Sequence, residues 1–360
     1  MSADTVIEQV TTDPIEDEHG LLAAPVTVGL GRRVLLRGLA TAVVALVLGL
    51  QIPKVITSTY YLGVVTDGVV LGILALGIGF LAHRSGLISL GHTAFYGGSA
   101  YAVAIATAHW GWSPMLAAIF ALAAGTAFAV ATGALVVRTP GMGFLMLTLA
   151  LGQALYQVSV LTGLRSVTGG FDGLALQYSS SNTVLGLTQS DLGQSSSFWP
   201  LAWTALVVVT VALWLVGRSR FGVVLEAIRE NEERARFSGY NTYFPRLVAF
   251  AISGACASLA GVLFALHANF VSPDVLSFVT AGNALIATIV GGFAVLVGPV
   301  VGAVAYIYAQ AKLSDTGHLE LYTGLALIIV LIFLPGGIVG FAVTQLQKLK
   351  PRMPTKRGKK

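Results

Sequence analysis

Residues 62–82 have the sequence LGVVTDGVVLGILALGIGFLA, in which Asp67 is the single charged side chain. A helix that crosses the hydrocarbon core of a bilayer needs about 20 mostly apolar residues. This stretch therefore predicts a transmembrane helix, with Asp67 within its first two turns.

The composition of the whole chain agrees with a membrane protein. Of the 360 residues, 55% are hydrophobic and 10% are charged, and the mean hydropathy is +0.81. Soluble domains carry about 25% charged residues, so this chain cannot form the polar coat of a water-soluble globule. The single cysteine, Cys256, excludes an intramolecular disulfide. The formal charge of +5 is not clustered on a folded face, which disfavours nucleic acid as a partner.

Ten apolar segments are predicted to span the membrane. They cover residues 34–52, 62–82, 91–108, 114–137, 142–163, 198–217, 247–268, 278–298, 299–314 and 319–341. The expected fold is an all-α, polytopic integral membrane protein with a membrane domain over residues 34–341. A cut near residue 197 gives two halves of five spans with opposite orientations, as an inverted five-helix repeat would require.

The distribution of positive charge predicts the orientation, because Lys and Arg stay on the cytoplasmic side. If the N-terminus is inside, 18 of the 21 Lys and Arg residues are cytoplasmic, and the three outside are Lys54, Arg165 and Lys312. We therefore expect a multi-pass protein of the cell membrane with both termini cytoplasmic. The loop 218–246 is then cytoplasmic, and the loop 164–197 is extracytoplasmic.

Both ends of the chain are predicted to lie outside the membrane domain. Residues 1–33 are acidic and lack the positive start of a secretory signal, so we expect a disordered segment and an uncleaved first helix. Residues 342–360 form a basic tail, expected to be cytoplasmic.

The sequence lacks the motifs of common enzymes. It contains neither the phosphate-binding loop of ATPases nor the signatures of serine and zinc hydrolases. The six histidines are never at ligand spacing on one helix, so no metal site is predicted. We expect no catalytic residue and no cofactor in this chain. Any energy for transport has to come from a partner, or transport is passive.

The cytoplasmic segment is predicted to contain one helix, from Phe221 to Ser238. Its apolar residues recur at helical spacing, and it contains two i,i+4 pairs of opposite charge, Glu230–Arg234 and Glu232–Arg236. Gly239 stands where a left-handed cap would end the helix. Two interpretations stay open: a solvated connector between spans, or a lever that docks on a cytoplasmic ATPase.

Seven blocks of sequence resemble the LivH/LivM-type permeases, and the LivM-like branch most closely. These blocks are residues 226–241, 86–97 (GLISLGHTAFYG), 146–150 (MLTLA), 168–174 (TGGFDGL), 271–273, 291–303 and 333–337. The resemblance covers about residues 62–341. It implies a membrane subunit of an ATP-binding-cassette importer for branched-chain amino acids. The implied partners are a homologous permease in a heterodimer, two cytoplasmic ATPase subunits that use the ATP, and an extracytoplasmic binding protein.

The resemblance also implies two contact surfaces. The predicted ATPase-coupling residues are Glu226, Arg229, Glu230, Asn231, Glu232, Arg234 and Gly239. The face that meets the binding protein is predicted to include Thr168, Gly169, Gly170 and Asp172.

Polar residues inside the spans are candidates for the transport pathway, because polar side chains in lipid need protein or water as partners. The candidates are Gly91, His92, Thr148, Gln153 and Asn283. Ordinary helix–helix packing is the alternative for each of them. The glycine pairs Gly68/Gly72, Gly298/Gly302 and Gly336/Gly340 are expected to allow close approach of helices.

Three positions depart from the pattern of the resembling family, which leaves the substrate open. Gly79 replaces a usual Asn, His83-Arg84 replaces a glycine–aromatic step, and residues 293–297 (FAVLV) replace a Gly-Thr pattern. A permease for urea or short amides is therefore an alternative. A passive channel for a small polar solute is another, distinguished by whether uptake needs ATP.

Overall fold

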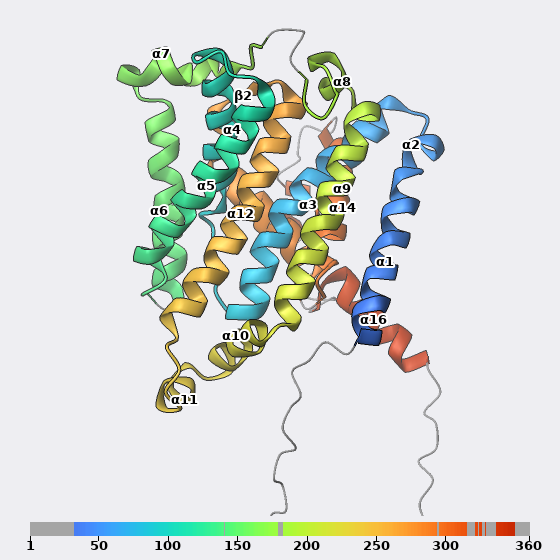
Figure 1. Cartoon of the computed structure of the whole chain (residues 1–360), viewed down its shortest axis with the longest axis vertical. Coiled ribbons are helices and arrows are strands. Elements are labelled where there is room, and N and C mark those ends of the chain that lie inside the picture. The colour runs from blue at the N-terminus through green and yellow to red at the C-terminus, as the bar shows by residue number, and fades with distance from the viewer. Residues whose placement is uncertain are drawn as a thin grey trace, which may run out of the picture.

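The computed structural model describes residues 32–139, 141–178, 183–293, 295–314, 321–322, 324–325, 328 and 336–349, and nearly all of its regular structure is helical (Figure 1). The long helices are α1 (Arg32–Leu50), α3 (Thr59–Ser85), α4 (His92–Ala108), α5 (Pro114–Val136), α6 (Gly141–Ser159), α9 (Ser195–Arg218), α12 (Tyr243–Ala268), α13 (Phe278–Gly291), α14 (Gly298–Leu313) and α16 (Gly337–Leu349).

Short elements connect the long helices. These are α2 (Ile52–Val55), α7 (Arg165–Thr168), α8 (Gln189–Gly193), α10 (Arg220–Glu230) and α11 (Glu232–Phe237), with 3-10 turns at Thr162–Leu164, Gly170–Asp172 and Pro273–Leu276. Two short strands, β1 (Leu174–Ala175) and β2 (Phe270–Val271), pair antiparallel with Leu174 opposite Val271.

Six helical segments of the described chain are long and apolar enough to cross a membrane. They are Arg33–Val55, Thr59–Ser85, Pro114–Val136, Gly141–Ser159, Ser195–Arg218 and Tyr243–Ala268. The prediction of an all-α, polytopic membrane protein is thereby confirmed.

Three further predicted spans form shorter helices. The helices α4, α13 and α14 have 17, 14 and 16 residues. The prediction that one span runs from 278 to 298 is wrong at its end, because α13 stops at Gly291 and Gly292 adopts a φ of +88° that no helix continues through. The predicted span 319–341 lies mostly outside the described residues, as do the acidic segment 1–31 and the tail from residue 350.

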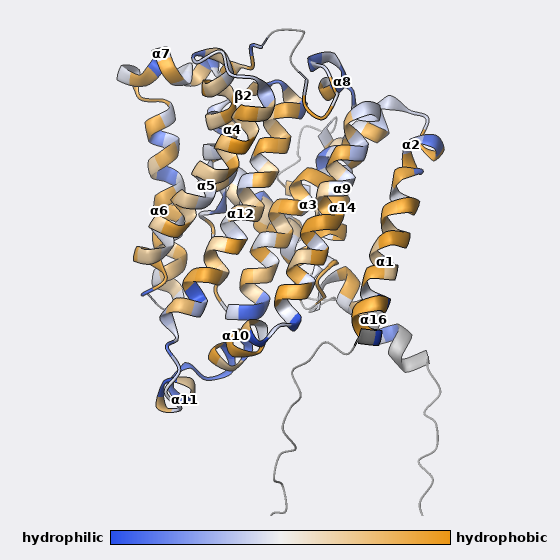
Figure 2. Cartoon of the chain, viewed as in Figure 1, coloured by the Kyte–Doolittle hydropathy of each residue, from blue (hydrophilic) through white to orange (hydrophobic). Residues whose placement is uncertain are grey.

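The bundle is centred on α3, with α12 beside it, while α1 and α6 lie at opposite edges (Figure 1). In the most apolar part of each helix, 83% of the residues of α3 are buried inside the protein, against 6% for α1. Figure 2 shows apolar residues along the helix lengths and hydrophilic ones at the two ends, as a bilayer requires. The central helix α3 therefore meets protein on nearly all sides, and α1 is free to face lipid.

Small residues let the central helices touch. Gly68 and Gly72 of α3 lie against Val304 and Val300 of α14, as the sequence predicted for this pair. A Cβ on Gly302 would lie 2.0 Å from the carbonyl oxygen of Ala287, so the Gly298/Gly302 pair likewise brings α14 against α13.

The two ends of the bundle carry different elements. The helices α10, α11 and α16 lie at the same end of the bundle as the start of α1. The elements α7, α8 and β2 lie at the opposite end (Figure 1). The loops 164–197 and 218–246 are therefore on opposite sides of the bundle, in agreement with an odd number of crossings between them. The helix α16 continues to Leu349 and so includes the first part of the predicted tail.

Candidate functional site

A cavity of about 480 Å³ opens between α3, α4, α12, α13 and α14. It lies toward the end of the bundle that carries α8, because its residues come from the first half of α3, the end of α12, the start of α13 and the second half of α14. One part of its wall is polar and another is aliphatic or aromatic; the lining includes Asp67, His267, Asn283, Gln310, Val70, Leu71, Phe264 and Ile307. Such a mixed lining suits a solute that has both charged and apolar groups.

The carboxylate of Asp67 faces the imidazole of His267 across this cavity. Asp67 Oδ1 lies 3.9 Å from His267 Nε2, and His267 Nδ1 lies 2.9 Å from the carbonyl oxygen of Leu192. A carbonyl only accepts, so Nδ1 carries the hydrogen and donates it, which turns Nε2 toward Asp67. The ring also stacks on Phe198 at 4.5 Å between centroids. The position of the imidazole is therefore fixed from two sides.

His267 was not among the sequence candidates, although a signal for it existed. Asp67 is near the outer end of its predicted span, and His267 is near the outer end of the span 247–268. The alternating topology places both at the same depth. Two titratable side chains at one depth of two apolar spans are enough to suggest a pair.

Three of the predicted pathway residues meet in a packed polar network at the start of α4, outside the cavity lining. His92 is buried, with Nε2 2.6 Å from Ser253 Oγ and Nδ1 3.0 Å from Ser89 Oγ. Ser253 donates its hydroxyl hydrogen to the carbonyl of Gly77 at 2.6 Å, so it accepts from His92 Nε2–H. This network holds the 89–92 turn to α3 and α12.

Gly91 and Thr148 complete this contact. Thr148 Oγ1 accepts the backbone N–H of Leu90 at 3.3 Å and donates to the carbonyl of Leu145 at 2.9 Å. A Cβ on Gly91 would lie 2.4 Å from the carbonyl oxygen of Thr148, so α4 and α6 touch here. Of the five pathway candidates, only Asn283 lines the 480 Å³ cavity, and Gln153 is half-buried on α6 away from it.

The segment 218–246 forms two helices, so the prediction of one continuous helix from Phe221 to Ser238 is wrong. The break is at Asn231, which is extended (φ −158°, ψ 100°) and whose side-chain oxygen accepts the N–H of Arg234 at 2.8 Å. Asparagine favours such caps over helix interiors because its side chain competes for the backbone. Glu230 and Arg234 consequently lie in different helices, whereas Glu232 and Arg236 keep their i,i+4 contact at 3.7 Å.

The end of α11 follows the predicted cap. Gly239 has a φ of +84°, with Gly239 N–H donating to Arg236 and Tyr240 N–H donating to Ala235. This pair of hydrogen bonds is the Schellman arrangement that ends many helices.

Ion pairs tie this segment to the membrane helices α3 and α12. Arg84 of α3 lies 3.3 Å from Glu226 of α10, and the side chain of Arg229 donates to the backbone carbonyl of His83. Glu232 of α11 lies 2.7 Å from Arg246 of α12. The segment α10–α11 is thus attached to both central helices, α3 and α12.

The charge state of Glu232 supports this attachment. Burial by itself raises the pKa of Glu232, but the hydrogen bond and charge of Arg246, with Thr242 and Arg236, outweigh burial and hold the pKa below its ordinary value. Because the pKa of this carboxylate is lowered in the folded protein, its ionised form stabilises the fold at pH values above its ordinary pKa. This stabilisation is lost only as the pH falls through the lowered pKa in the acid range. The contact with Arg246 is therefore fully formed at neutral pH.

A groove of about 240 Å³ runs along α10 and α11. Its lining includes Val223, Ala227, Glu230, Asn231, Arg234, Ala235 and Tyr240. Next to it, Phe237 is 91% exposed. An exposed aromatic ring beside an apolar groove is typical of a docking surface. Three of the predicted coupling residues, Glu230, Asn231 and Arg234, line the groove. Phe237 is a further candidate for ATPase contact that the sequence analysis missed.

The predicted binding-protein face forms a compact turn at the other end. Thr168 Oγ1 donates to the carbonyl of Ser159 at 2.7 Å, and Arg165 pairs with Asp172 at 2.6 Å. Gly169 and Gly170 both have positive φ, and Phe171 between them and Asp172 is 73% exposed. The four predicted residues are thus brought together in one turn, in which Asp172 is exposed, Gly169 is half-buried, and Thr168 and Gly170 are buried.

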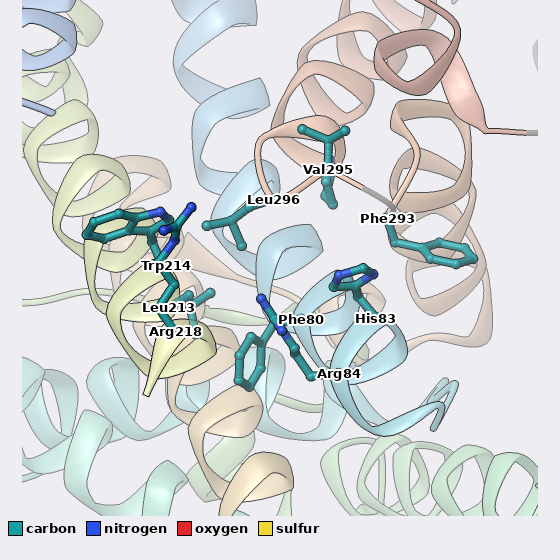
Figure 3. A pocket seen from close by; sticks show the side chains of 11 residues that line it. Phe80, His83, Arg84, Leu213, Trp214, Arg218, Phe293, Val295 and Leu296 are labelled. Atoms are coloured by element: carbon teal, nitrogen blue, oxygen red, sulfur yellow. The ribbon is translucent and has the colours of Figure 1, made fainter. Parts of the chain in front are cut away.

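A second cavity, of about 180 Å³, lies where α3 and α9 end beside the loop 292–297 (Figure 3). Gly79, His83 and Arg84 line it from α3, and Phe293, Val295 and Leu296 line it from the loop. The three departures noted in the sequence therefore meet at one place. Within the described ranges, no group of three His, Cys, Asp or Glu side chains could hold a metal ion.

The helical bundle, its mixed cavity and the groove on α10 and α11 are consistent with a polytopic membrane permease. The chain belongs to the family described as "Branched-chain amino acid transport system / permease component", which matches residues 60–342. The resemblance found in the sequence is thereby confirmed.

Individual relatives agree with this family. The high-affinity branched-chain amino acid transport system permease protein LivM of Escherichia coli (strain K12) is 28% identical over 303 residues, covering 77% of this chain and 69% of LivM. LivM of Salmonella typhimurium is also 28% identical, over 301 residues with the same coverage. The autoinducer 2 import system permease protein LsrC of Yersinia pseudotuberculosis is 29% identical over 147 residues, 38% of this chain and 42% of LsrC. No solved structure matches the chain.

Proposed function

We propose that this permease is one subunit of an ATP-binding-cassette importer that moves branched-chain amino acids into the cell. One observation carries the proposal: the two helices that are tied to the cytoplasmic segment also bear the paired cavity residues. Arg84 and Asp67 are both on α3, and Arg246 and His267 are both on α12. At a rise of 1.5 Å per residue, these pairs are about 26 and 32 Å apart along their helices.

This arrangement supports a mechanical link between ATP use and the cavity. ATP closes a dimer of partner ATPases docked on α10 and α11. Movement of these helices displaces the ends of α3 and α12 through the Arg84–Glu226 and Arg246–Glu232 contacts. Since both helices are rigid, the displacement reaches the walls of the cavity. The chain supplies a route and a lever and takes no chemical step itself.

The partners follow from the same proposal. A homologous permease forms the second half of the route, and an extracytoplasmic binding protein delivers the solute to the end that carries α7 and α8. In the turn that contains Thr168 and Gly170, the exposed side chains of Phe171 and Asp172 are the surface offered to that protein. Reconstituted uptake that needs no ATPase and no ATP would favour the passive channel instead.

The substrate class is supported by the lining of the 480 Å³ cavity. A carboxylate at Asp67 suits an ammonium group, the amides of Asn283 and Gln310 suit a carboxylate, and Leu71 with Ile307 suits an aliphatic side chain. The LivM relatives are named for branched-chain amino acid transport. Urea and short amides have no charge that would use Asp67.

Replacing Asp67 by Asn should reduce leucine uptake at least about tenfold, because an unpaired ammonium in a partly buried site loses a charge-assisted hydrogen bond. The measurement is uptake of labelled leucine by the complete importer, with urea as a competitor. The control is Asp274→Asn, which removes an exposed carboxylate that does not line the cavity. Unchanged leucine uptake by Asp67→Asn, or strong competition by urea, would contradict the amino acid assignment.

The orientation is testable with single cysteines in a Cys256→Ala background. Ser166 and Ser238 are both exposed, at opposite ends of the bundle. A membrane-impermeant thiol reagent added outside intact cells should label Ser166→Cys and leave Ser238→Cys unlabelled until the cells are opened. Labelling of Ser238→Cys alone would reverse the proposed orientation.

A further inference from the structure

The 180 Å³ cavity at the ends of α3 and α9 has an unusual concentration of positive charge. Arg84 comes from the last turn of α3, and Arg218 ends α9 with its guanidinium 5.1 Å from the ring centroid of Trp214. Figure 3 shows Trp214 and Arg218 on one wall, and His83 with Phe293 on the wall across from them. Two guanidinium groups thus border one small space.

The negative charge nearby does not balance these cations. Arg84 pairs with Glu226, whose side chain is 51% exposed. Arg218 forms no ion pair with any acidic side chain of the described residues. Gly217 lets Arg84 cross the surface of α9, because a Cβ there would lie 2.8 Å from the guanidinium. The cavity is therefore electropositive and has room for an anion.

The helix α1 adds to this surface. Gly38 packs on the ring of Trp214, so the first turns of α1 lie next to the cavity, and Arg33 and Arg37 are exposed on those turns. Basic clusters at the ends of membrane helices attract anionic lipid.

The depth and size of the cavity indicate what the anion is attached to. The residues lie in the final turns of two apolar helices, where a bilayer changes from hydrocarbon to head groups. Trp214 is the kind of side chain that anchors at this boundary, and Leu296 and Phe293 provide apolar wall beside it. The volume of about 180 Å³ is below that of usual small-molecule pockets. It suits a head group whose remaining part lies in the membrane.

We propose that this cavity binds the phosphate of an anionic phospholipid, with Arg84 and Arg218 as the phosphate ligands. Arginine holds phosphate oxygens through two parallel N–H donors, and so fixes the head group in orientation. Arg84 is also the partner of Glu226, so an occupied cavity adjusts the contact between α3 and the segment α10–α11. The proposal takes only the orientation of the chain from the proposed function. With that orientation, the phospholipid belongs to the cytoplasmic leaflet.

The test measures lipid binding to the purified full-length protein. The protein is first delipidated, each probe is then added, and binding is monitored by native mass spectrometry. The probes are dioleoylphosphatidylglycerol, dioleoylphosphatidylcholine and inorganic phosphate. We expect phosphatidylglycerol to bind at least tenfold more tightly than phosphatidylcholine, which has the same acyl chains. Equal binding of both lipids would overturn the proposal, and inorganic phosphate that binds and displaces phosphatidylglycerol at equal concentration would overturn the lipid as the source.

Two variants locate the site. Arg218→Gln should weaken phosphatidylglycerol binding about tenfold, while Arg220→Gln, an exposed arginine outside the cavity, should leave it unchanged. Leu296→Trp fills the cavity and keeps every charge, so it should weaken binding as well. Loss in Arg218→Gln without loss in Leu296→Trp would mean surface attraction and overturn the cavity as the site. Because transport is not the readout, failure here is distinct from failure of the importer proposal.

Discussion

Replacing Gly261 by Val should prevent the protein from folding stably in the membrane. A Cβ on Gly261 would lie 1.9 Å from the carbonyl oxygen of Tyr96 and 2.4 Å from Ser99 Oγ. The first of these is backbone and cannot move without moving α4. Overpacking of a core costs about 1–3 kcal/mol when side chains can adjust, and here they cannot. We expect a loss above that range, seen as a collapsed yield of monodisperse protein.

The region around Gly261 makes the loss larger than a single clash. Ser99 Oγ donates to the carbonyl of Ser258 at 2.8 Å, and this bond joins α4 to α12 one turn away. Separation of the two helices breaks that bond in an environment that offers no water as a replacement.

The matched control is Gly282→Val on α13. Gly282 is also helical, but nothing lies within 4 Å of the Cβ that it would gain. Thermal unfolding of this variant, followed by size-exclusion fluorescence, should resemble that of the wild-type protein. Equal loss from both substitutions would show that helical glycine is needed for another reason than close approach, and normal folding of Gly261→Val would contradict the packing described for α4 and α12.

The sequence predicted features that depend on neighbours along the chain. Apolar runs located the long helices, and the spacing of Gly68 and Gly72 predicted a close helix contact that α14 provides. Gly239 was placed correctly because helix caps are set by local backbone geometry. In each case the responsible interaction spans only a few residues or a single helix face.

Features that depend on contacts across the fold could not be predicted in this way. His92 and Asn283 are both polar residues in predicted spans, yet His92 is satisfied by Ser89 and Ser253 while Asn283 faces a cavity. The difference lies in which helix packs opposite, and Ser253 is 161 residues away from His92 in the chain. Sequence spacing does not contain that information.

The break at Asn231 was in principle predictable. The apolar stripe and the charge pairs favoured one long helix, but Asn231 has the side chain of a helix cap, and Glu232 and Glu233 follow it as acids at a first turn. These local preferences prevailed because α11 gains its own anchor, Glu232 to Arg246, once it turns away from α10.

The second large effect concerns Phe237. Its ring is 91% exposed, so Phe237→Ala should leave the free energy of unfolding nearly unchanged. If the ring anchors a partner ATPase, the same substitution should weaken that association at least about tenfold, as truncation of a central aromatic residue does at protein interfaces. The measurement is co-purification of the ATPase subunits at matched expression, together with ATP-dependent uptake.

Phe244→Ala is the control, because Phe244 is also an exposed phenylalanine, 62% accessible, but belongs to the first turn of α12 and does not line the groove. We expect it to retain the ATPases. A solvated connector predicts no difference between the two variants, and equal retention of the ATPases by both would remove Phe237 from the docking surface.

A charge variant then separates docking from transmission. Glu230 and Arg234 line the groove on either side of the break at Asn231, and neither forms an ion pair with a described residue. Glu230→Ala with Arg234→Ala should therefore keep the fold and weaken ATPase docking less than Phe237→Ala.

Glu226→Ala instead removes the ion pair with Arg84, and Glu226 lies outside the groove. This variant should keep the ATPases bound while ATP hydrolysis no longer drives uptake. Because a lever can fail either at its contact or at its attachment, these two outcomes distinguish a lever from a connector. Full uptake by Glu226→Ala at normal ATP hydrolysis would exclude the Arg84 contact from the path of force.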